Sequence, residues 1–197
     1  AERLAQADAA AAALCAAGYE PIGLDHFALP DDPLAVVARR GWLRRNFQGY
    51  TVIPADDVIG LGISAIGDVR GAYVQNEKKL SRYQQAVESG TLPVERGFAR
   101  TREDEMRREL IHELMCNHKL DLREFGARWE VEFSEHFTED LRRLQQHVES
   151  GMVRATDELI EATPEGELFI RNVAMCFDTY WRDKHEGGDK PVFSRTV

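Results

Sequence analysis

Cysteine is scarce in this sequence: the 197 residues contain three, Cys15, Cys116 and Cys176. They are far apart, and neither a CxxC nor a CxxxCxxC spacing occurs. Because an iron–sulfur cluster of the CxxxCxxC kind needs three closely spaced thiolates, the chain as given cannot supply those ligands. An odd, dispersed set of cysteines is typical of reduced thiols, and we expect a cytoplasmic protein.

Long apolar runs are missing as well. No stretch approaches the ~20 apolar residues that span a membrane, and the mean hydropathy is −0.42. The alanine-rich start is interrupted by Glu2, Arg3 and Asp8, which does not suit the apolar centre of a signal peptide. We therefore expect an ordinary helix there, no membrane span and no secretion.

Positive charge is in deficit. The chain has 25 Lys and Arg residues against 34 Asp and Glu residues, which gives a net charge of −9. General affinity for nucleic acid needs clustered Lys and Arg, so we expect no nucleic-acid partner. The apolar content of 43% is enough for a real core.

Residues 1–95 predict an α/β unit. The expected elements are helices at 2–17, 33–40 and 74–89, and buried strands at 19–28 and 57–68, with a loop at 44–51. This alternation is typical of parallel strands. Two strands do not complete a sheet or barrel, so we expect the last part of a larger α/β unit.

Residues 96–197 predict a second, mostly helical domain. Thr101 and Asp104 have the spacing of a capping box. The expected elements are helices at 101–121, 121–131 and 138–151, a hairpin at 152–164 and a final helix at 164–182. This set is typical of a winged-helix-like domain. Arg142 and Arg143 stand among acidic residues, which favours a packing module over a DNA reader.

Two polar clusters permit two interpretations each. His112, Cys116 and His118 in "HELMCNH" could bind a metal, but Cys116 stands where HExxH has its second histidine and lies near an apolar stripe, so packing is favoured. Asp25 and His26 end the first expected strand, where α/β proteins bind ligands, although Asp25 could simply cap a turn. The glycines of "GLGISAIGD" (60–68) allow close approach either to a ligand or to a neighbouring strand.

The segment "RRNFQGYT", residues 44–51, has the residue types of a binding loop. Phe47 or Tyr50 can stack on a flat ring, and the Gln48 side-chain amide can orient a ligand. Arg44 or Arg45 can pair with carboxylates. The segment therefore predicts a surface for a large planar or carboxylate-bearing ligand.

The strings "DHFA", "NFQGYT" and "FIRNVAMCFDTY" together closely resemble the later part of the oxygen-independent coproporphyrinogen III oxidases. The resemblance implies a radical S-adenosylmethionine enzyme with a partial α/β barrel and a helical C-terminal domain. It implies oxidative decarboxylation of two propionates of coproporphyrinogen III to vinyl groups in haem biosynthesis, by a monomer with a [4Fe–4S] cluster.

The resemblance also assigns residues. Ile66, Phe47 and Gln48 match positions at a second S-adenosylmethionine, and we take Arg44, Arg45 and His26 as substrate-binding candidates. The cluster cysteines lie upstream in the family, so we expect roughly the C-terminal two fifths of such an enzyme, inactive alone, with no catalytic or metal-binding residue. The alternatives are a paralogue that handles haem and a non-catalytic winged-helix interaction module.

Overall fold

The computed structural model describes residues 2–181, without the side chains of Arg3 and Leu4. The chain forms two compact units, one of Ala1–Val52 with Glu109–Val197 and one of Ile53–Arg108. The division expected at residues 95 and 96 does not coincide with these units; as a division of a larger protein it remains a prediction. Within residues 2–181, no helix combines the length and the apolar character needed to cross a membrane.

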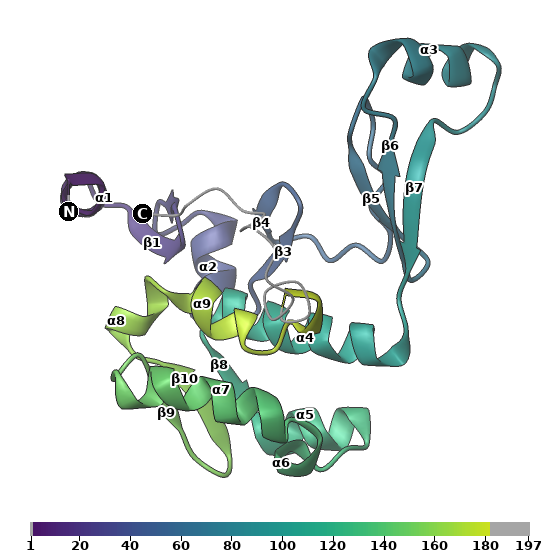
Figure 1. Ribbon diagram of the computed structural model, residues 1–197. Coiled ribbons are helices and arrows are strands. Elements are labelled where there is room, and N and C mark those ends of the chain that lie inside the picture. Colours follow the sequence, from purple (N-terminus) through teal and green to yellow (C-terminus); the bar gives the residue numbers. More distant parts are fainter. Residues whose placement is uncertain (1, 182–197) are drawn as a thin grey trace. The chain divides into compact units, whose positions relative to one another are not determined.

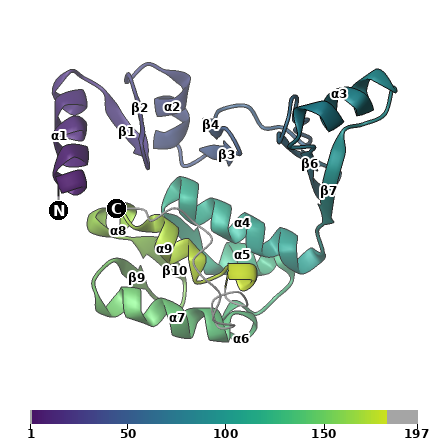
Figure 2. The ribbon, with the colours of Figure 1, turned by 45° about the horizontal axis from the view of Figure 1, so that its top comes forward.

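The first unit begins with two helices and two hairpins. The elements are α1 (Glu2–Ala16), β1 (Glu20–Gly23), β2 (His26–Ala28), α2 (Pro33–Arg39), β3 (Arg44–Asn46) and β4 (Gly49–Thr51). Both helices lie where the sequence predicts them, and Asp32 caps α2 by accepting a hydrogen bond from the Leu34 amide at 2.7 Å. Figure 2 shows α1 and α2 on either side of the β1–β2 hairpin.

Two predictions for this region are wrong. Residues 19–28 form a hairpin rather than one buried strand, because Gly23 and Leu24 adopt positive φ angles of 149° and 49° and turn the chain. Residues 44–51 form a second hairpin rather than a loop, with Arg44 opposite Thr51, Arg45 opposite Tyr50 and Asn46 opposite Gly49. Three-residue strands are too short to show a hydrophobic period.

The strands of the described residues pair antiparallel throughout, so the expected parallel pairing is also wrong within this part of the chain. The reason is the length of the connections. Leu24–Asp25 joins β1 to β2, and Phe47–Gln48 joins β3 to β4. A parallel pair needs a crossover of a dozen or more residues, whereas two residues suffice for a hairpin.

The rest of the first unit follows the prediction closely. Its elements are α4 (Arg102–Asn117, of which Glu109 onward belongs to this unit), β8 (Lys119–Asp121), α5 (Leu122–Trp129), α6 (Phe133–His136), α7 (Thr138–Glu149), β9 (Val153–Ala155), β10 (Leu159–Ala162), α8 (Pro164–Glu167) and α9 (Ile170–Met175). Asp121 caps α5 as a hydrogen-bond acceptor for the Glu124 amide. The expected hairpin gains a third strand in the order β8-β10-β9, and the expected last helix is broken between α8 and α9. Residue 182 lies outside the described residues.

Two apolar clusters hold this unit. Phe125, Phe133, Phe137 and Phe177 are buried, with ring centroids 4.6 Å apart for Phe133 and Phe137 and 6.0 Å apart for Phe137 and Phe177. The second cluster contains Ile22, Ala28, Ala35, Leu43 and Cys116. It therefore joins the two chain segments of this unit, because Cys116 comes from α4 and the others come from residues 22–43.

The second unit is a three-stranded antiparallel sheet with one helix. Its elements are β5 (Ile66–Val69), β6 (Ala72–Asn76), α3 (Leu80–Glu88) and β7 (Val94–Ala99), together with the start of α4. Figure 1 shows α3 at one end of the sheet, between β6 and β7. Two further predictions are corrected here: most of 57–68 is irregular, and the expected helix 74–89 begins as a strand.

The irregular segment folds back on the sheet because of its glycines. A Cβ at Gly60 would lie 2.9 Å from the Ile66 backbone, and Gly62 has a φ of +98°. The Asn76 side-chain amide donates hydrogen bonds to the carbonyls of both glycines, each at 2.9 Å. Asn76 therefore ends β6 and fixes the segment before β5 with one side chain.

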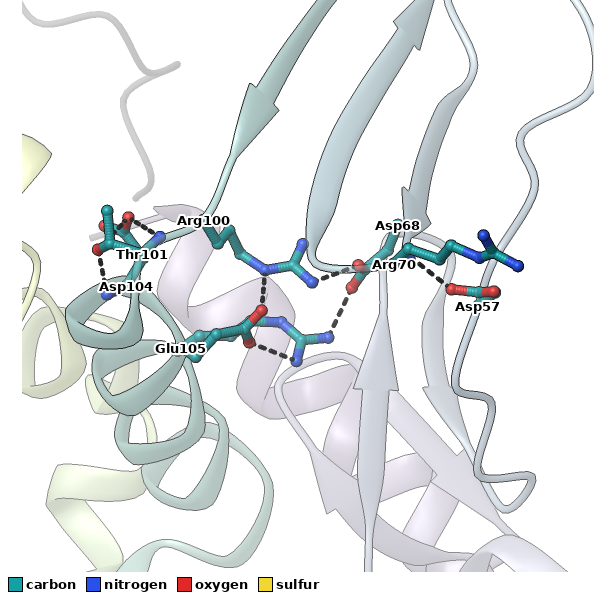
Figure 3. A network of polar contacts seen from close by, with 8 residues as sticks. Asp57, Asp68, Arg70, Arg100, Thr101, Asp104 and Glu105 are labelled. Carbon is teal, nitrogen blue, oxygen red and sulfur yellow. Dashed lines mark hydrogen bonds and ion pairs between the residues drawn. The ribbon is translucent and has the colours of Figure 1, made fainter. Parts of the chain in front are cut away.

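A buried ion-pair network lies at the other end of this unit (Figure 3). The Asp68 carboxylate accepts hydrogen bonds from Arg100 and Arg108, each at 2.7 Å. The side chain of Arg100 is only 5% exposed; it also donates to Glu105 at 2.6 Å and lies 4.3 Å from the Tyr73 ring centroid. These contacts attach the first turn of α4 to the sheet.

The predicted capping box begins α4 beside this network. Asp104 accepts hydrogen bonds from the Thr101 amide at 2.8 Å and the Thr101 hydroxyl at 2.7 Å, and the Asp104 amide donates to that hydroxyl at 3.2 Å. The prediction is confirmed. The helix start is thus satisfied by its own side chains.

We predict that Asp68→Ala destabilises the chain by about 3 kcal/mol, because it leaves the buried Arg100 guanidinium with one of its two carboxylate partners. Urea denaturation followed by circular dichroism measures the change. The matched control is Glu95→Ala, which removes a more exposed contact to Lys78 at 3.9 Å. That variant should change stability by less than about 1 kcal/mol. Equal effects of the two variants would show that the Asp68 network does not stabilise the fold.

Candidate functional site

The β3–β4 hairpin presents Phe47 and Gln48 at its two-residue turn. The Gln48 backbone amide donates a hydrogen bond to the Asn46 side-chain oxygen at 2.8 Å, which leaves the side-chain amide of Gln48 for other contacts. Gly49 follows with a φ of +140°. The Phe47 side chain is 49% exposed, and Gln48 is exposed. The turn therefore offers a flat ring and an amide on a short, hydrogen-bonded support.

The two strands of this hairpin are both attached to α4. The Arg45 amide donates to His112 Nε2 at 2.9 Å, and the Tyr50 hydroxyl donates to the Met115 carbonyl at 3.0 Å. A ring nitrogen that accepts a hydrogen bond is unprotonated, so His112 carries its proton on Nδ1 in this arrangement. Burial raises the pKa of Tyr50; nearby Cys116 adds to the rise, and Arg45 opposes it.

The hairpin is also interlocked with β1–β2 through two glycines. A Cβ at Gly23 would lie 2.5 Å from the Tyr50 hydroxyl oxygen, and a Cβ at Gly49 would lie 2.8 Å from His26 Nε2. The His26 and Tyr50 rings meet edge to face, with centroids 4.9 Å apart. Each hairpin thus supplies one glycine and one ring, and each ring packs where the other hairpin has no side chain.

The candidate arginines differ in their surroundings. Successive side chains of a strand point to opposite faces, so Arg44 and Arg45 diverge. Arg44 is exposed. The Arg45 guanidinium carbon lies 5.2 Å from the Tyr50 ring centroid, and its Nη1 is buried without a hydrogen-bond partner among the residues that the structure describes.

His26 has a defined orientation. Its Nδ1 lies 2.9 Å from the Asp25 carboxylate, and its side chain is 33% exposed. The carboxylate accepts a hydrogen bond from Nδ1–H, which leaves Nε2 turned toward Gly49. The structure thus brings His26 together with Tyr50 and Gly49.

Ile66 belongs to the second unit. It is the first residue of β5, pairs with Gln75 and is 38% exposed. Its backbone contacts the glycine-rich segment at Gly60. The five other sequence-predicted residues, Arg44, Arg45, Phe47, Gln48 and His26, all belong to the first unit.

The predicted cluster around His112 does not assemble a metal site within residues 2–181, where no group of three or more His, Cys, Asp or Glu side chains is placed to hold an ion. His112 Nε2 faces the Arg45 amide and lies 3.6 Å from Cys116 Sγ. His118 instead lies 3.5 Å from Glu167. These contacts favour the packing interpretation.

The cysteines do not fit an iron–sulfur cluster either. Burial raises the pKa of Cys116 to about 12 and that of Cys176 to about 11, and neither thiol belongs to a group of three or more potential metal ligands among the described residues. Cys15 is exposed. We therefore assign no cluster-binding role to these cysteines.

The two arginines of α7 are engaged within their own helix. Arg142 and Arg143 donate to Glu139 at 2.7 and 3.4 Å. The hydrogen bond from Arg142 lowers the pKa of Glu139 to about 2. This pairing favours the packing interpretation over recognition of a nucleic-acid backbone.

Sequence reasoning named Tyr50 as a possible stacking ring and His112 as a possible metal ligand, but it missed that both residues attach the β3–β4 hairpin to α4. Their partners are 65 and 67 residues away along the chain, and no local spacing indicates such a contact. The signal that was present is Gly49 beside an aromatic residue, which permits close packing of another ring.

Part of the chain matches a known protein family. Residues 101–169 match the family model described as the HemN C-terminal domain. The solved structure of coproporphyrinogen III oxidase (HemN) from Escherichia coli, described as a radical SAM enzyme, matches with a TM-score of 0.84 at 44% identity; the match covers 88% of this chain and 40% of that one.

The particular relatives carry one name. The chain is similar to oxygen-independent coproporphyrinogen III oxidase from Escherichia coli K12, at 45% identity over 87% of this chain and 37% of the relative. The protein of that name from Synechocystis is 39% identical over 100% of this chain and 42% of the relative. The chain is thus homologous to part of oxygen-independent coproporphyrinogen III oxidase and spans about two fifths of the length of these relatives. The resemblance inferred from the sequence is confirmed.

We predict that iodoacetamide alkylates Cys15 and spares Cys116 and Cys176 in the folded chain at pH 8. Cys15 is exposed, whereas burial keeps the other two thiols protonated at that pH. Mass spectrometry of tryptic peptides reports the modified sites, and the urea-unfolded chain, which should react at all three, is the control. Alkylation of Cys116 as fast as Cys15 would contradict the packing interpretation.

Proposed function

We propose that this chain is part of an oxygen-independent coproporphyrinogen III oxidase, a cytoplasmic, monomeric enzyme of haem biosynthesis. The whole enzyme oxidatively decarboxylates two propionates of coproporphyrinogen III to vinyl groups. Homology along 87–100% of the chain supports this function. The chain alone is inactive in this proposal, because its cysteines do not fit the required cluster.

The proposal includes an architecture for the larger protein. The elements up to residue 95 are the last part of a partial α/β barrel, and residues 96–197 are a winged-helix-like domain. The sheet β8-β10-β9 together with α5 and α7 supports the second assignment, since a winged helix combines a small antiparallel sheet with helices. In this architecture, the β1–β2 and β3–β4 hairpins would lie at the ends of the barrel strands and would not be part of the barrel sheet.

The observation that carries the proposal is the β3–β4 turn. Its half-exposed ring and exposed side-chain amide fit one wall of a site for a second S-adenosylmethionine. Ile66, in the second unit, is assigned to this cofactor by resemblance alone. A separate S-adenosylmethionine at the upstream cluster would supply the radical chemistry that removes hydrogen from the propionate. The residues of this chain orient the ligand: Phe47 by stacking and Gln48 by hydrogen bonding.

Arg44, Arg45 and His26 are the proposed contacts to substrate carboxylates. Arg44 has the exposure and the forked geometry for a bidentate pair with a propionate. The buried Arg45 Nη1 supports a role for this guanidinium as well, since a buried donor is costly unless some group accepts its hydrogen bond. The residues thus fit an acidic substrate.

We predict that Gln48→Ala and Phe47→Ala, in the full-length protein that contains this chain, lower kcat/KM by the equivalent of about 1–3 kcal/mol. The loss reflects one or two ligand contacts, so thermal stability should stay nearly unchanged. Anaerobic product formation and a thermal melt measure the two quantities. Gln84→Ala on α3, also an exposed glutamine, is the matched control. Full activity in both turn variants would show that the turn is structural.

We predict that Arg44→Gln raises the KM for coproporphyrinogen III about tenfold, the cost of one charge-assisted hydrogen bond. Binding of S-adenosylmethionine, followed by equilibrium dialysis, should not change. Arg40→Gln, at another exposed arginine of the same unit, serves as the control. An unchanged KM for Arg44→Gln would remove this residue from the substrate site.

A further inference from the structure

The two ring nitrogens of His26 are directed at protein groups rather than away from them. Nδ1 lies 2.9 Å from the Asp25 carboxylate, and Nε2 lies where a Cβ of Gly49 would be only 2.8 Å away. We propose that His26 is a positioning residue that sets the Phe47–Gln48 turn by packing against the backbone of Gly49. This inference rests on the proposed function, because the turn is the proposed ligand contact.

The steric argument begins at Gly49. Its φ of +140° is one that L side chains rarely adopt, so a glycine is required there for the hairpin to turn. The missing side chain leaves room that the His26 ring fills. Because Gly49 follows Gln48 directly, a shift of the Gly49 backbone moves the Gln48 amide and the Phe47 ring with it.

The ring itself is held on two further sides. Asp25 fixes its rotation through Nδ1, and the Tyr50 ring meets it edge to face at 4.9 Å. Tyr50 is in turn anchored to the Met115 carbonyl. The Asp25 side chain is largely exposed, so this pair adds little to stability. Its effect is on orientation: without the carboxylate the ring can rotate and lose its fit against Gly49.

The substrate-binding role inferred from the sequence is the competing interpretation for His26, and a pair of variants separates the two. In the full-length protein, His26→Ala removes the ring, whereas His26→Phe keeps a ring against Gly49 and removes both nitrogens. A positioning role predicts that His26→Ala weakens S-adenosylmethionine binding about 10- to 100-fold, the scale of a displaced contact, and that His26→Phe recovers most of the loss. Equilibrium dialysis measures the affinity.

Hydrogen–deuterium exchange of the turn amides gives a readout that does not depend on cofactor or activity. His26→Ala should accelerate exchange at Gln48, whose amide is bonded to Asn46, and His26→Phe should not. Asp25→Asn should give a smaller change in the same direction, and it replaces His26→Ala if that variant does not fold. Gly49→Ala should perturb the turn less in the His26→Ala background than in the parent, because the ring that its Cβ would meet is gone.

Each outcome decides the question. Equal losses in the Ala and Phe variants, confined to the substrate KM and with turn exchange unchanged, would overturn the positioning role in favour of direct contact. Unchanged exchange in both His26→Ala and Asp25→Asn would also overturn it. If the parent protein binds no S-adenosylmethionine, the proposed function fails, while the exchange measurement still tests the contact between His26 and Gly49.

Discussion

The mutual packing of glycines and rings between β1–β2 and β3–β4 is the constraint on which the candidate site depends. The Tyr50 side chain packs against Gly23, and the His26 ring packs against Gly49. Tyr50 then reaches the Met115 carbonyl on α4, beside Cys116 in the apolar cluster. Each contact requires a glycine on the opposite hairpin. The position of the Phe47–Gln48 turn is therefore set by packing between the two hairpins and α4. Two isolated hairpins would be marginal in water.

The second unit is stabilised differently. Its sheet strands bury little apolar surface: every residue of β7 is exposed, and the buried side chain of β5 is that of Asp68. A buried carboxylate between two guanidinium groups gains little over an apolar pair, yet losing one partner is costly. The network therefore specifies where α4 begins more than it adds stability. The capping box at Thr101 specifies the same point.

The sequence predicted the features that depend on neighbouring residues. The capping box at Thr101 and the hairpin at 152–164 depend on residues within a few positions, and both were predicted. The β1–β2 and β3–β4 hairpins were missed because their strands are three or four residues long. Phe47 and Gln48 stood out by residue type and by resemblance. The contacts that support them did not, since Tyr50 and His112 bond to partners more than sixty residues away along the chain.

The cost of unsatisfied groups bears on what the β3–β4 hairpin is for. Among residues 2–181, four buried side-chain atoms lack a hydrogen-bond partner, and Arg45 Nη1 is the one beside the candidate turn. A buried unpaired donor costs about 1–3 kcal/mol. Arg100 Nη1 belongs to a guanidinium that lies over the Tyr73 ring and is engaged by two carboxylates, whereas Arg45 has the weaker contact with Tyr50 at 5.2 Å. A hairpin selected for stability alone would not combine such a donor with a glycine at +140° and a half-exposed phenylalanine. Local costs of this kind gather at functional sites. The combination therefore supports the proposed ligand site at this hairpin.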